Sequence, residues 1–174
     1  LNIAACYNYM GEILRKQKHF EEANAYYKEA VATCDSNHCP CNATFYSNMA
    51  RSYLAMGKTR QSTEALYRAD RVYEESFTLI GRSITKGYLA VLEAEKGNKE
   101  GAVRYLEDAQ KSARQFASPY AIGLLALTEA ELLVRFPEEF QEILTEPVEV
   151  YKDMAKRCLK EIPGAYEIEW LEDI

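Results

Sequence analysis

The chain has 174 residues, of which 48% are hydrophobic and 28% are charged, a composition typical of one globular domain. With a formal net charge of −6 and no basic cluster, the chain is expected to make no direct nucleic-acid contact, because neutralising phosphates requires clustered cations. No apolar run reaches the roughly 18 residues that span a membrane, and few Gly or Pro residues interrupt a composition that favours helices.

Helical hairpins are expected along most of the chain. The first covers residues 1–34, and two more cover 42–78 and 82–116. An irregular fourth hairpin is predicted over 118–145, and a capping helix over 147–162 precedes a tail of residues 163–174. The chain begins at Leu1 rather than Met, so we expect a fragment of a longer protein.

Local signals mark where these helices start and stop. Gly57 and Gly97 are predicted to end first helices in the left-handed conformation. Thr59 and Asn98 follow them as N-cap candidates for the second helices. Ser118 followed by Pro predicts another helix N-terminus.

A cysteine-rich segment, CDSNHCPC, connects the first two hairpins at residues 34–41. Three interpretations of Cys34, His38, Cys39 and Cys41 are kept: a plain turn, a structural metal site and a redox disulfide. We favour the turn and expect no metal, because structural zinc sites combine two well-separated ligand pairs. Five cysteines in a helical chain also predict a reducing, cytoplasmic setting rather than a disulfide framework.

A ladder of small and large residues recurs at intervals of 39 and 40 residues. Each unit has a small residue, a second small one twelve residues later, a large one four further on, and a third small one after three more. Small residues let two helices approach closely, so the ladder predicts stacked helical hairpins. The corresponding positions are Gly11/Ala50/Ala90, Ala23/Ser62/Ala102, Tyr27/Leu66/Leu106 and Ala30/Ala69/Ala109.

This ladder resembles the tetratricopeptide repeat family over about residues 4–110. The resemblance implies an all-α fold: a right-handed superhelix of stacked antiparallel hairpins, an α-solenoid with a C-terminal capping helix. The units exceed the usual 34 residues, and such long units look like the repeat domains of bacterial signal-responsive transcription regulators. The family resemblance therefore implies a protein-binding scaffold.

Catalytic motifs are missing from the sequence. It contains no Gly-rich phosphate loop, no H-E-x-x-H and no G-x-S-x-G. Adjacent carboxylates at Glu21/Glu22, Glu74/Glu75 and Glu138/Glu139 point in different directions on a helix and predict solvated faces. We expect neither an enzyme nor a cofactor.

The first helices of the stack should line a concave groove. Polar and apolar side chains on this face suit an extended peptide or a helix from a partner protein. The predicted groove residues are Asn8, Glu12, Arg15, Ser47, Asn48, Arg51, Leu54 and Val91.

The leading hypothesis is thus a protein- or peptide-binding module, the sensory or assembly part of a larger bacterial regulator. The alternative is a small-ligand sensor with a pocket between hairpins. No membrane association is expected. A homodimer through the groove, or through the acidic and apolar tail at 163–174, is a further alternative.

Overall fold

A computed structural model of the chain describes residues 3–34, 40–160 and 162. Helices are the regular structure throughout this part, which contains no strand. The predicted all-helical fold with consecutive helix-pair contacts, as in a tetratricopeptide-type solenoid, is confirmed. The contacts divide the chain into two compact units, Leu1–Gly81 and Arg82–Ile174, which are described separately here. The right-handed superhelical twist stays a prediction.

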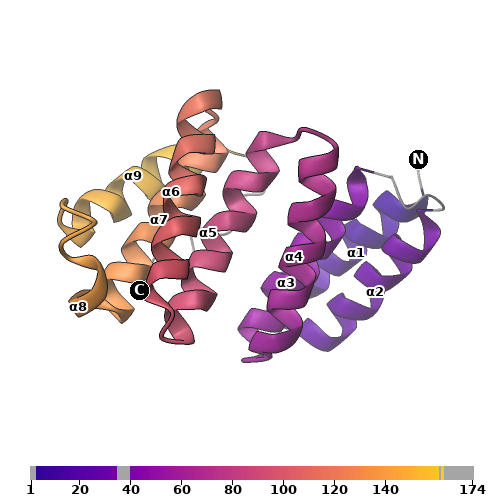
Figure 1. The fold of residues 1–174 in the computed structure, drawn as a ribbon. Coiled ribbons are helices and arrows are strands. Elements are labelled where there is room, and N and C mark those ends of the chain that lie inside the picture. Colours follow the sequence, from indigo (N-terminus) through magenta and orange to yellow (C-terminus); the bar gives the residue numbers. More distant parts are fainter. Residues whose placement is uncertain (1–2, 35–39, 161, 163–174) are drawn as a thin grey trace. The chain divides into compact units, whose positions relative to one another are not determined.

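Unit 1 consists of two consecutive hairpins and the start of a further helix. α1 packs on α2, α2 packs on α3, and α3 packs on α4 (Figure 1). The second hairpin therefore contacts the second helix of the first hairpin. The helices are α1 (Ile3–Lys16), α2 (Phe20–Thr33), α3 (Cys41–Ala55), α4 (Thr59–Glu75) and α5 (Leu79–Glu95).

Unit 2 contains most of α5 and the helices that follow it. Its core joins apolar side chains of α5 and α6 to those of α7, α8 and α9. α7 packs chiefly against α9, and α8 is a single turn. The remaining bounds are α6 (Lys99–Phe116), α7 (Pro119–Arg135), α8 (Pro137–Phe140) and α9 (Val148–Lys160).

The small-residue ladder is buried at every position that the sequence assigns to it. In the first hairpin, a Cβ atom on Gly11 would lie 2.5 Å from Cε1 of Tyr27, so the tyrosine ring fills the space that a side chain would need. In the second hairpin, the Ser62 hydroxyl donates to the Ala50 carbonyl at 2.9 Å. Both contacts join the first helix of a hairpin directly to its second helix. The buried ladder residues are Gly11, Ala50, Ala90, Ala23, Ser62, Ala102, Tyr27, Leu66, Leu106, Ala30, Ala69 and Ala109.

The helix ends follow the predicted signals with one exception. Gly57 and Gly97 have φ values of 68° and 73°, in the left-handed region. The Asn98 side chain accepts from the Gly101 N–H at 3.1 Å, as expected of an N-cap. The prediction for Thr59 is wrong, because α4 already begins at this residue and Lys58 is its N-cap. The connection after Gly57 is one residue long, as it is after Gly97, so the N-cap position falls on the residue next to the glycine.

Replacing Ala109 by Leu is expected to lower the free energy of unfolding by about 1–3 kcal/mol, because a larger side chain would overpack the hairpin of α5 and α6. Ala109 is fully buried, and its carbonyl accepts from the Ser83 hydroxyl across that hairpin. Glu107→Ala, two residues away on the exposed face, is the control and should have almost no effect. Urea denaturation measures both variants, and equal losses would contradict the register of the ladder.

Candidate functional site

Seven of the eight predicted groove residues lie in unit 1, on α1 and α3. Asn8, Glu12 and Leu54 are half-buried, whereas the two arginines are buried at 5% and 8% exposure. The eighth residue, Val91, packs in the hydrophobic core of unit 2. We call the seven residues of unit 1 the first-helix face: Asn8, Glu12 and Arg15 from α1, with Ser47, Asn48, Arg51 and Leu54 from α3.

Hydrogen bonds connect α1 to α3 on this face. Asn48 on α3 donates from Nδ2 to Oδ1 of Asn8 on α1 at 2.9 Å. Arg51, one turn further along α3, donates from Nη1 to Oδ1 of Asn48 at 3.5 Å. The Asn48 carboxamide thus acts as donor and acceptor at once, which fixes its orientation between the two helices.

Glu12 is the centre of a second set of polar contacts on the same face. Arg15 donates to both of its carboxylate oxygens, from Nε at 3.2 Å and from Nη2 at 3.1 Å. The Tyr27 hydroxyl, on α2, donates to the same carboxylate. Because Tyr27 also fills the space above Gly11, one side chain connects the packing of the hairpin to its polar face.

The environment of Glu12 favours its ionised form. Burial by itself raises the pKa of this carboxyl group, but the hydrogen bonds and charge of Arg15, the charge of Arg51 and the bond from Tyr27 outweigh it. The pKa of Glu12 therefore lies below its ordinary value. Burial and the adjacent carboxylate raise the pKa of Tyr27, so its hydroxyl stays protonated and serves as a donor.

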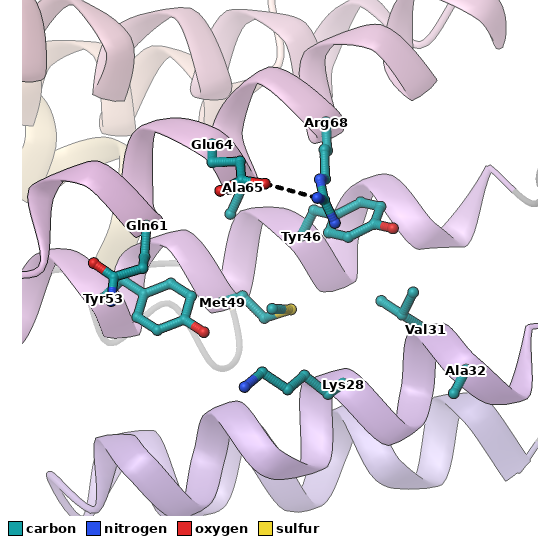
Figure 2. A pocket seen from close by; sticks show the side chains of 10 residues that line it. All are labelled: Lys28, Val31, Ala32, Tyr46, Met49, Tyr53, Gln61, Glu64, Ala65 and Arg68. Carbon is teal, nitrogen blue, oxygen red and sulfur yellow. Dashed lines mark hydrogen bonds and ion pairs between the residues drawn. The ribbon is translucent and has the colours of Figure 1, made fainter.

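An open cavity of about 330 Å³ lies on another side of unit 1, between α2, α3 and α4 (Figure 2). None of the groove residues predicted from the sequence lines this cavity. The apolar part of its wall comes mainly from Val31, Met49 and Ala65. The full lining is Lys28, Val31 and Ala32 from α2, Tyr46, Met49 and Tyr53 from α3, and Gln61, Glu64, Ala65 and Arg68 from α4.

Periodicity could have shown part of this site. Tyr46, Met49 and Tyr53 follow one face of α3 at helical spacing, and Gln61, Glu64 and Arg68 follow one face of α4. The spacing reveals which residues share a face. It does not reveal that the three faces leave a space between them, because that depends on how far apart the helices pack.

The cysteine segment is only partly described. The sulfur atoms of Cys34 and Cys41, at the facing ends of α2 and α3, lie 3.1 Å apart. His38 and Cys39 fall outside the described residues, as does the tail at 163–174. Within the described part of the chain, no three metal-binding side chains cluster. The turn, metal and disulfide interpretations all stay predictions.

Two further features of the described residues bear on function. No helix there combines the length and apolar character that crossing a membrane requires. The adjacent carboxylates at Glu21/Glu22, Glu74/Glu75 and Glu138/Glu139 are all exposed, as predicted for solvated faces.

Comparison with known families agrees with the geometry of the first hairpin. The family described as tetratricopeptide repeat matches residues 3–34, the segment that forms α1 and α2. The predicted resemblance to this family is therefore confirmed for that hairpin. Such repeats generally mediate protein–protein interaction and are typically non-enzymatic scaffolds. No curated protein matches the chain.

Glu12→Gln is expected to lower the free energy of unfolding at pH 7 by about 1.5–3 kcal/mol, the usual contribution of hydrogen bonds to a charged group. Since the folded state depresses the pKa of Glu12, the stabilisation is complete above the unfolded value of 4.5 and is lost as pH falls through the lower folded value.

The difference between wild type and Glu12→Gln should accordingly shrink in acid. Denaturant titrations at pH 7, 5 and 3 measure it, with Glu29→Gln on the exposed side of α2 as the matched control. A difference that stays constant down to pH 3 would show that the ionised carboxylate is not what stabilises this network.

Proposed function

We propose that this chain is a protein- or peptide-binding module and that the first-helix face of unit 1 is its binding surface. The observation that carries the proposal is the hydrogen-bond chain from Asn8 through Asn48 to Arg51, which spans two successive hairpins. Side chains held in one orientation before a partner arrives lose less conformational entropy on binding.

The chemistry of this face suits an extended peptide. Asn8 is half-buried. Its Oδ1 accepts from Asn48, but its Nδ2 group donates to no described residue, so Nδ2 is available to a peptide carbonyl. Half-buried Leu54 on α3 offers an apolar contact. A side-chain donor for the peptide backbone and an apolar contact on the same face are the combination that peptide-binding surfaces use for affinity and selectivity.

The wider role that we propose is the sensory or assembly part of a larger bacterial regulator. Its support is the unit length of 39 and 40 residues, which resembles the repeat domains of signal-responsive transcription regulators. Self-association through the first-helix face or through residues 163–174 is part of the same proposal.

A second candidate function is a small-ligand sensor, and the cavity of about 330 Å³ favours it. This volume lies at the lower end of the range typical of small-molecule sites. The walls come from both hairpins of unit 1, so a ligand held there would contact each of them.

Peptide binding is tested on an array of immobilised eight-residue peptides of varied sequence, followed by fluorescence polarisation with the peptides that bind. Asn8→Ala should weaken binding by up to about tenfold, because it removes one donor and the acceptor of the Asn48 bond. Lys28→Met is the control, since this exposed lysine lies on α2 away from the first-helix face. Equal weakening by both variants, or the absence of any peptide that binds, would overturn the assignment.

A further inference from the structure

The cavity and the first-helix face use opposite sides of α3. Residues advance by about 100° along a helix, since one turn takes about 3.6 residues. Met49 and Tyr53 consequently lie across the helix axis from Asn48 and Arg51. The cavity is therefore a separate candidate site, and a ligand could occupy it without touching the predicted groove.

One positive charge in the cavity wall lacks a compensating partner. Arg68 pairs with Glu64 at 2.7 Å, as the dashed line in Figure 2 shows, and its guanidinium lies 5.8 Å from the centre of the Tyr46 ring. Lys28 extends from α2 with its amine toward the Tyr53 side of the cavity in Figure 2, and it forms no ion pair or hydrogen bond with any described residue. The cavity wall therefore carries a net charge of about one positive unit, which attracts an anion.

The remainder of the wall suits an apolar body. The side chains of Val31, Met49 and Ala65 are apolar, and two tyrosine rings extend the surface toward the two ends of the cavity. Aromatic and thioether groups of this kind pack well on flat or branched hydrocarbon groups. At one end, the Tyr53 hydroxyl and the Gln61 carboxamide are polar groups without a hydrogen bond to another described residue.

We propose that this cavity binds a small organic monocarboxylate with an aromatic or branched apolar body, and that Lys28 anchors the carboxylate. The inference rests on the second proposed function, ligand sensing, and is independent of the first. The volume of about 330 Å³ is sufficient for a compact body of this type. An apolar pocket with a few fixed polar groups is the usual design of small-molecule sites, in which the polar groups set the orientation of the ligand.

The test uses two probes of nearly identical shape, 3-phenylpropionate and its neutral amide, 3-phenylpropionamide. Isothermal titration calorimetry with the full chain should show the acid binding at least about tenfold more tightly than the amide, because only the acid forms a charge-assisted bond with Lys28. Lys28→Met keeps an aliphatic side chain of similar length and removes the charge. In this variant the two probes should bind with equal affinity, close to that of the amide in the wild type.

Two more variants locate the binding. Ala65→Leu fills the cavity from α4 and should abolish binding of both probes, with the melting temperature confirming that the variant is folded. Lys111→Met removes an exposed lysine from α6 in unit 2, and should bind both probes as the wild type does.

Carboxylate specificity and binding in the cavity can each fail separately. Equal affinity of the acid and the amide for the wild type would overturn the carboxylate specificity while leaving ligand sensing intact. If neither probe binds, the assignment of this cavity to compact aromatic ligands is overturned. Unchanged binding in a folded Ala65→Leu variant would place the probes elsewhere on the protein.

Discussion

Close approach of two helices at small residues is the constraint on which the other features of unit 1 depend. Gly11 lets the Tyr27 ring lie directly on α1, and at the equivalent position of the next hairpin Ser62 bonds to the carbonyl of Ala50. These contacts set the spacing within each hairpin. They also bring the Tyr27 hydroxyl within reach of Glu12, so the polar contacts of the first-helix face exist because the packing beneath them is tight. A larger residue at Gly11 would disturb both at once.

The hydrogen bonds and ion pair of the first-helix face add structural specificity to helix packing that is otherwise apolar and permissive. Buried ionic and carboxamide groups contribute little net stability when they replace hydrophobic contacts, yet leaving one of them without partners is costly. The Asn48–Asn8 bond forms only when α1 and α3 stand in one register, whereas the Glu12–Arg15 pair forms within α1. In unit 1 the network therefore selects one arrangement of successive hairpins and, at the same time, presents oriented donors on the surface.

The helices of unit 2 pack around a more apolar core. Val91 and Leu106 join residues of α7, α8 and α9 in one hydrophobic cluster. Its buried carboxyl group, Glu129, accepts from Gln110 at 2.8 Å, but burial has the larger effect and raises the pKa of Glu129. Glu12, surrounded by arginines, shows the opposite shift. The two units thus share a ladder of small residues while differing in how polar their buried surfaces are.

The sequence by itself determined the helical class, the repeat ladder and most helix ends, because those depend on local conformational preference and on spacing along one helix. The left-handed Gly57 and Gly97 and the N-cap Asn98 are examples. It also identified Asn48 and Arg51 as neighbours on one face of α3. Only the tertiary structure decided that Asn48 bonds to Asn8, that Val91 belongs to a core, and that three helix faces leave a cavity beside Lys28. These outcomes depend on distances between helices, which arise from the sum of many side-chain contacts and leave no periodic signal in the sequence.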